Sequence, residues 1–208
     1  MRFEEWKGWF HGCDAVVGGC GPSARRLLET QDIARPTFTH GGACVVDRWS
    51  LVCNRMAAEI YDPDFAVCLE PPRDKCWQVV KDTTAPVVFS HILRGKRGNQ
   101  PHPRICQIPG QNVYEWFDQE TPDGEKPLHL GQSAFYAAAI AGYLGFETIG
   151  LIGVDLTADR WVDATPPSRA WCRLRDSLAE AGHRLVNLSP DSRLEGIEKA
   201  PWSEVRCK

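Results

Sequence analysis

The stretch Asp14-Ala15-Val16-Val17-Gly18-Gly19-Cys20-Gly21-Pro22-Ser23 joins a short apolar run to a glycine-rich turn. The apolar run is typical of a buried strand. The residues from Ser23 to Glu29 have helical composition, with Leu27 and Leu28 on one side. The stretch therefore predicts a strand, a tight turn and a helix in that order.

The rest of the chain repeats this alternation of apolar runs and helical segments. Two helices are expected, at 132–144, where Gly145 ends an alanine-rich run, and at 168–181. Further strands are expected at 45–46 with 49–53, at 65–69, at 86–90, at 148–154 and at 184–188. Helices that alternate with buried strands predict an α/β fold, namely a Rossmann-like, doubly wound, mostly parallel sheet.

The 208 residues are read as one domain, 1–208, because no linker divides them. A segment at about 94–128 is rich in Gly, Pro, Asn and Gln, and it predicts an irregular, loop-rich insertion. With 43% hydrophobic and 25% charged residues, the composition is that of a globular protein with a substantial core.

Charge and cysteine content narrow the classes of partner. The net charge of −3 gives no strong nucleic-acid signal. The most apolar run, 134–144, is shorter than the roughly 20 residues that span a bilayer, so no membrane span is expected. The nine cysteines show no zinc-site spacing, and the first residues lack the apolar run of a secretion signal. Reduced thiols and a cytoplasmic location are expected.

The glycine turn is the first candidate site. Glycines let backbone N–H groups approach a phosphate, and the following helix adds the positive end of its dipole. The spacing matches neither the Gly-x-Gly-x-x-Gly fingerprint nor a Walker loop, so the turn alone fits a tight strand-to-helix connection equally well.

Two further candidate residues are expected at the carboxyl edge of the sheet, where parallel sheets bind their ligands. Asp155 comes just after strand 148–154, where it is suited to hold a metal or a hydroxyl, or to cap its own turn. Ser133 opens the alanine-rich helix, as an N-cap or a ligand contact.

Seven short segments in one order then resemble a known superfamily. It joins bacterial sialyltransferases that use CMP-sialic acid, flagellin-glycosylating motility accessory factors, and archaeal 6-hydroxymethyl-dihydropterin diphosphokinases. The segments are Val16–Ser23, Cys53-Asn54-Arg55, Pro63-Asp64, Gly131-Gln132-Ser133, Leu144-Gly145-Phe146, Ile152–Leu156 and Asn187–Ser192.

This resemblance implies a set of nucleotide-binding residues. They are Gly19, Cys20, Gly21, Pro22, Ser23, Asn54, Gln132 and Ser133. Cys20 stands where these families have Asn, and a thiol is a weaker donor than an amide. The sialyltransferase base is a His beyond the equivalent of Asp155, but 157–181 contains no His.

His91 is the preferred substitute among the remaining histidines, because it follows strand 86–90 at the ligand edge, with Arg94, Lys96 and Arg97 nearby. His91 and Asp155 are thus the candidate catalytic residues. A solvated loop explains the basic cluster equally well.

The leading hypothesis is a nucleotide-dependent transferase, glycosyltransferase-like, that binds a nucleotide-sugar donor and an unidentified acceptor. One alternative is a diphosphokinase that transfers diphosphate from ATP to a pterin- or nucleoside-like alcohol, with Asp155 and Asp64 holding Mg²⁺. Another is a noncatalytic nucleotide- or partner-binding module. The oligomeric state is open, a homo-oligomer included.

Overall fold

A computed structural model describes residues 2–19, 21, 23, 43–47, 64–67, 87–90, 103–109, 112–120, 133–155 and 167–205. Their strands form one sheet in the order β5-β4-β3-β2-β1-β6-β7-β8, and every pair of neighbours is parallel. The bounds are β1 Ala15–Gly18, β2 Ala43–Asp47, β3 Phe65–Val67, β4 Val87–Ser90, β5 Ile105–Gln107, β6 Thr148–Ile152, β7 Arg184–Asn187 and β8 Glu198–Lys199.

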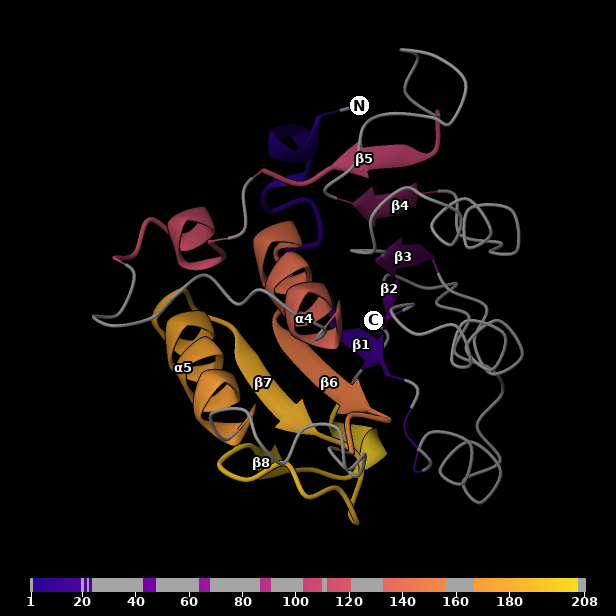
Figure 1. Cartoon of the computed structure of the whole chain (residues 1–208), viewed down its shortest axis with the longest axis vertical. Coiled ribbons are helices and arrows are strands. Elements are labelled where there is room, and N and C mark those ends of the chain that lie inside the picture. Colours follow the sequence, from indigo (N-terminus) through magenta and orange to yellow (C-terminus); the bar gives the residue numbers. More distant parts are fainter. Residues whose placement is uncertain are drawn as a thin grey trace.

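The sheet is wound outward in both directions from β1 (Figure 1). Strands β2 to β5 follow one another on one side of β1, and β6 to β8 follow on the other side. Val17 is level with Val45 of β2 and with Leu151 of β6. The predicted α/β fold with a doubly wound, parallel sheet is confirmed, and its topological switch point lies between β1 and β6.

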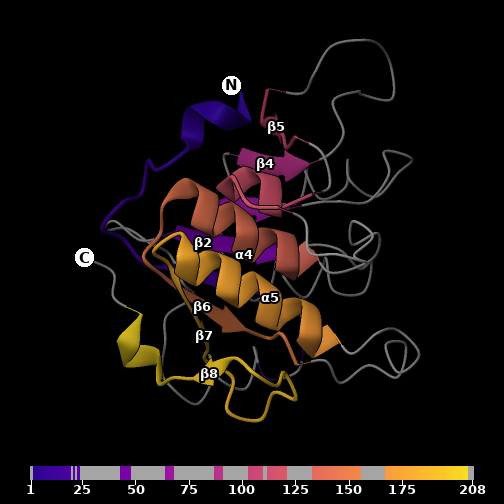
Figure 2. The ribbon, with the colours of Figure 1, turned by 90° about the vertical axis from the view of Figure 1, so that its left-hand side faces the viewer.

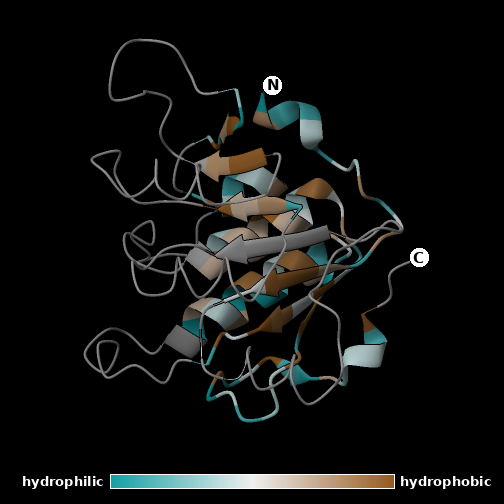
Figure 3. Ribbon diagram, turned by 90° about the vertical axis from the view of Figure 1, so that its right-hand side faces the viewer, coloured by the Kyte–Doolittle hydropathy of each residue, from teal (hydrophilic) through white to brown (hydrophobic). Residues whose placement is uncertain are grey.

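Two described helices, α4 (Ser133–Leu144) and α5 (Pro167–Glu180), cover the same face of the sheet (Figures 1 and 2). Helix α4 packs on β1 and β2, and its side chains from Ala134 to Gly142 are all buried. Such all-round burial explains its alanine-rich sequence, because small side chains let the sheet and α5 approach on different sides. Helix α5 is amphipathic, with Trp171, Leu174 and Leu178 facing inward. Apolar residues gather on the strands (Figure 3).

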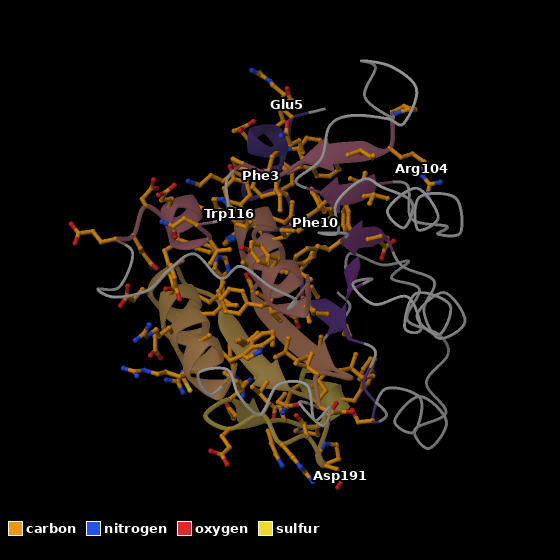
Figure 4. All side chains as sticks on the ribbon, in the orientation of Figure 1. Phe3, Glu5, Phe10, Arg104, Trp116 and Asp191 are labelled. Carbon is orange, nitrogen blue, oxygen red and sulfur yellow. The ribbon has the colours of Figure 1, made fainter. Side chains whose placement is uncertain are left out.

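The N-terminal segment closes one end of this core with aromatic rings. It contains the short 3₁₀ helix η1 (Phe3–Trp6). Phe3 stacks on Tyr143 of α4 with ring centroids 4.4 Å apart, and Phe10 stacks on Phe146 at 4.6 Å. Both rings, and that of Trp116, point into the molecule (Figure 4). Trp6, Trp116 and Trp171 are buried, so these tryptophans serve packing.

The expected irregular insertion at 94–128 differs from the structure in part. Within it, Ile105–Gln107 forms the edge strand β5, which pairs with β4, and Tyr114–Phe117 forms the 3₁₀ helix η2. The two-residue strand β8 on the other side was not expected either. Both strands are too short for a hydrophobic period, and each exists because a neighbouring strand offers unpaired backbone groups. The expected extended residues 49–53 lie outside the described ranges.

Two simpler expectations can be checked in the described residues. Cys13, Cys106 and Cys172 are free thiols, and burial raises the pKa of Cys106 to about 11. None of the helices within the described ranges is long and apolar enough to cross a lipid bilayer.

Gly145 and Gly182 end α4 and α5 in the same way, which makes them a matched pair. Their φ angles are +98° and +90°, so alanine at either position should cost about 1–2 kcal/mol from the backbone alone. A Cβ on Gly145 would also lie 2.8 Å from Cα of Gly8, whereas a Cβ on Gly182 would meet nothing within 4 Å. We expect Gly145→Ala to lower the free energy of unfolding, measured in urea, clearly more than Gly182→Ala. Equal losses would contradict the packing of the N-terminal segment on α4.

Candidate functional site

The candidate site is built where the chain leaves β1 and β6 at the carboxyl edge of the sheet. The amide of Gly19 donates to the carbonyl of Ile152 at 2.7 Å, and the amide of Gly21 donates to that of Gly153 at 2.7 Å. The glycine turn therefore continues along β6 beyond the last paired strand residues. A Cβ would lie 2.5 Å from the Gly153 carbonyl oxygen if placed on Gly19, and 2.6 Å from it if placed on Gly21. Both glycines are needed because two backbones touch here.

Asp155 fastens the end of the same turn. Its Oδ2 accepts a hydrogen bond from the amide of Ser23 at 2.7 Å, and its Oδ1 accepts one from the Ser23 hydroxyl. Ser23 is in helical conformation, so the carboxylate sits where a helix start presents its free N–H groups. The exposed fractions are 5% for Asp155 and 7% for Ser23. This bond joins residues 132 positions apart and holds the turn against β6.

The segment after β7 supplies a third wall. The Ser189 hydroxyl oxygen lies 2.8 Å from that of Ser23 and accepts a hydrogen bond from the amide of Gly153 at 3.1 Å. The Ser192 hydroxyl donates to the carbonyl of Val154 at 2.7 Å. The bonds among Ser23, Asp155, Ser189 and Gly153 thus join the ends of β1, β6 and β7 in one buried network, whereas Ser192 bonds separately to Val154 and Leu194.

The structure brings four of the residues expected from the sequence together: Gly19, Gly21, Ser23 and Asp155. Ser133 is the first residue of α4, but its side chain is not described. Five expected site residues lie outside the described ranges, namely Cys20, Pro22, Asn54, His91 and Gln132.

The amides that were expected to cradle a phosphate form hydrogen bonds within the protein. The glycines predict free amides in the turn, yet the amides of Gly19, Gly21 and Ser23 all donate within the protein. They are used because the turn runs parallel to the extension of β6 and completes its backbone pairing. The described amides of the turn are therefore not open donors.

Asp64 is separated from Asp155 by the topology. It precedes the first residue of β3, at the amino edge, whereas Asp155 follows the carboxyl end of β6. Three strand spacings of about 4.8 Å, from β3 through β2 and β1 to β6, place the two strands about 14 Å apart. The two carboxylates therefore cannot share one magnesium ion. The described residues also contain no cluster of three or more His, Cys, Asp or Glu side chains suited to a metal.

A hollow of about 730 Å³ lies at the opposite, amino edge of β6 and β7. Its charged groups are largely paired, since Arg184 contacts Glu198 and Glu204 at 2.8 Å each. His183 lines it as well, and burial lowers the pKa of this imidazole, whose Nδ1 lies 2.8 Å from the carbonyl of Phe146. Ligands of open α/β sheets bind at the carboxyl edge, so this hollow is not the candidate site.

Ser189 and Gly153 lie within two of the segments that carry the resemblance, but the sequence did not identify either as a site residue. The available signal was a pair of serines, Ser189 and Ser192, directly after a buried strand. In a parallel sheet this position converges with the other strand ends, but only the strand order reveals which residues meet.

Solved structures of low sequence identity share this architecture. The sialyltransferase CstII from Campylobacter jejuni, in complex with the substrate analogue CMP-3FNeuAc, aligns with a TM-score of 0.53 at 14% identity, covering 90% of this chain and 85% of that chain. CstII in complex with a trisaccharide acceptor and CMP aligns with a TM-score of 0.53 at 13% identity, covering 90% of this chain and 86% of that chain. The MAf glycosyltransferase from Magnetospirillum magneticum AMB-1 gives 0.50 at 16% identity, covering 99% of this chain and 38% of that chain.

The chain has the fold of these glycosyltransferases. The fold implied by the resemblance is therefore confirmed. No family model matches the sequence, and no curated protein matches it significantly.

The network makes Asp155 important for stability even without a ligand. Asp155→Ala leaves the buried Ser23 amide without an acceptor, which should cost about 1–3 kcal/mol in the free energy of unfolding. Asp155→Asn should cost less, because its carbonyl oxygen still accepts from that amide. Urea unfolding of the ligand-free protein measures both.

The control is Asp176→Ala. Its carboxylate is 59% exposed and pairs with Arg175 on α5, so the loss should stay within about 1 kcal/mol. An unchanged stability of Asp155→Ala would show that the carboxylate does not hold the turn.

Proposed function

We propose that this protein is a nucleotide-dependent transferase that uses a nucleotide-sugar donor. The observation that carries the proposal is the glycine turn held rigidly at the switch point between β1 and β6. Open parallel sheets bind their ligands in the crevice outside this point, since the connections on either side lead to opposite faces. The shared fold with CstII and MAf supports the choice of a glycosyl donor over other nucleotide ligands.

The donor is assigned to the turn Gly19–Ser23, with Asn54, Gln132 and Ser133 as further contacts. Gly19, Gly21 and Ser23 use their amides internally, and Pro22 has no N–H. We assign the remaining backbone N–H of the turn, that of Cys20, to a phosphate of the donor. A cytidine nucleotide is the first candidate, since the CstII complexes contain CMP-based ligands.

Catalysis is assigned to positioning and to a histidine base. The acceptor hydroxyl attacks the sugar carbon that carries the phosphate, the sugar–phosphate bond breaks, and the nucleotide leaves with the bonding electrons. His91 accepts the proton of the acceptor hydroxyl in this scheme. Holding donor and acceptor in line supplies much of the rate enhancement. Asp155 acts by holding the turn.

Magnesium does not fit the described carboxylates. Asp155 directs both oxygens at Ser23, and Asp64 lies at the other edge of the sheet. The scheme therefore assigns no step to a metal. Diphosphate transfer from ATP, which relied on these two residues, loses its expected metal ligands.

Binding of nucleotides tests the proposal directly. The melting temperature is measured with CMP, CDP, UDP, GDP and ATP, each with and without magnesium. We expect a cytidine nucleotide to raise the melting temperature without magnesium. A ligand that binds only the native state, present at 100 times its Kd, adds about 2.7 kcal/mol to the free energy of unfolding. Gly182→Ala, at the far edge, should keep the shift, whereas Gly19→Ala should lose it.

Other results would change the conclusion in defined ways. A shift with ATP that requires magnesium would replace glycosyl transfer by diphosphoryl transfer. No shift with any nucleotide would favour a noncatalytic binding module.

The role of His91 is tested by turnover. With the donor that binds, His91→Ala should slow donor consumption by about 10²–10⁴-fold, the usual contribution of a general base, and leave the donor Kd unchanged. His11→Ala is the control, since His11 is exposed at the amino-edge hollow. Unchanged turnover of His91→Ala would remove His91 from the mechanism.

A further inference from the structure

We propose that Ser189 is a positioning residue of the candidate site, which sets the glycine turn through the hydroxyl of Ser23. The inference rests on the proposed function for its effect on nucleotide binding. Its structural part stands on the hydrogen bonds alone. Ser189 is 0% exposed and comes from the segment after β7, to which neither the glycine turn nor Asp155 belongs.

The protons of the network can be assigned. The Ser23 hydroxyl lies within hydrogen-bonding distance of Oδ1 of Asp155 and of the Ser189 oxygen. A hydroxyl has one proton, and a carboxylate has none to give. Ser23 therefore donates to Asp155, and Ser189 donates to Ser23. The chain of donors runs from the β7 segment through the turn to the end of β6.

Ser189 also acts as an acceptor. Its oxygen accepts a hydrogen bond from the amide of Gly153 at 3.1 Å. The carbonyl of Gly153 in turn accepts a hydrogen bond from the amide of Gly21 at 2.7 Å. A single hydroxyl thus orients both partners of the contact between the turn and β6. Loss of this hydroxyl leaves the buried Gly153 amide unpaired and removes the donor to Ser23.

The orientation of Ser189 is itself fixed by Asn187. The Asn187 side chain is 1% exposed, and its Oδ1 accepts the amide of Ser189 at 3.0 Å. This local turn starts at the last residue of β7. The strand end therefore holds the backbone from which the Ser189 hydroxyl reaches Ser23 and Gly153.

Ser192 provides a matched control in the same segment. It is 5% exposed, donates to the carbonyl of Val154 at 2.7 Å and accepts the amide of Leu194 at 3.1 Å. Ser189→Ala and Ser192→Ala thus remove the same group from similar burial, but only the first removes the partner of Ser23.

The first measurement needs no ligand. Hydrogen exchange at the amides of Gly19, Gly21 and Ser23 should be at least about tenfold faster in Ser189→Ala than in Ser192→Ala, since local opening of a packed contact governs exchange. Equal exchange at these amides in the two variants would overturn the inference, whether or not the protein binds a nucleotide.

The second measurement uses the nucleotide identified in the thermal-shift panel and a double-mutant cycle. We expect Ser189→Ala to weaken its Kd about tenfold, the loss of about one hydrogen bond, and Ser192→Ala to leave it within about twofold. In a Ser23→Ala background, Ser189→Ala should have little further effect, because the two act through one contact. Additive effects of the two changes would mean that Ser189 does not act through Ser23.

Two checks keep the outcomes separate. If no nucleotide binds to the unmodified protein, the proposed function fails, and hydrogen exchange still decides the role of Ser189. If Ser189→Ala does not fold, Ser189→Cys keeps a weak donor on a slightly larger side chain, and it should speed exchange at the same amides by a smaller factor.

Discussion

The organisation of the carboxyl edge depends on one close contact between two backbones. After β1 and β6 end, Gly19 stays paired with Ile152 and Gly21 with Gly153. No side chain fits between the two backbones, and the pairing takes up amides that an isolated glycine turn would leave open. Ser23 and Asp155 then close the contact with a buried, charge-assisted hydrogen bond.

This contact gives the two glycines a structural role. In many nucleotide-binding turns, glycine lets a phosphate approach the backbone. Here Gly19 and Gly21 let one strand extension approach another, and any benefit to a ligand is indirect. A pre-positioned turn loses little conformational freedom when a ligand binds, so rigidity itself favours binding.

The polar groups at the two edges of the sheet differ in burial and pairing. At the amino edge, surface ion pairs such as that between Arg184 and Glu198 surround the ends of α5 and β7. At the carboxyl edge, the described polar groups Ser23, Asp155 and Ser189 are buried and bonded to one another. Buried polar groups that satisfy one another stabilise a single arrangement, because each alternative leaves a donor or acceptor unpaired.

The sequence by itself determined the α/β class, strands β1, β3, β4, β6 and β7, and both helices α4 and α5. Each of these segments has a sufficient apolar run or a clear end signal, such as Gly145 after α4. Local patterns of this kind depend only on residues that are close together in the sequence, so the sequence alone predicts them.

Only the tertiary structure decided which residues meet at the site. Strands β5 and β8 exist through pairing with β4 and β7, and their own two or three residues carry no pattern. The strand order places Asp64 and Asp155 at opposite edges of the sheet, and it brings Ser189 to Ser23, which lies 166 positions away in the sequence. Contacts between distant segments depend on strand order and register, which come from the packing of the whole sheet and are not encoded in any short stretch.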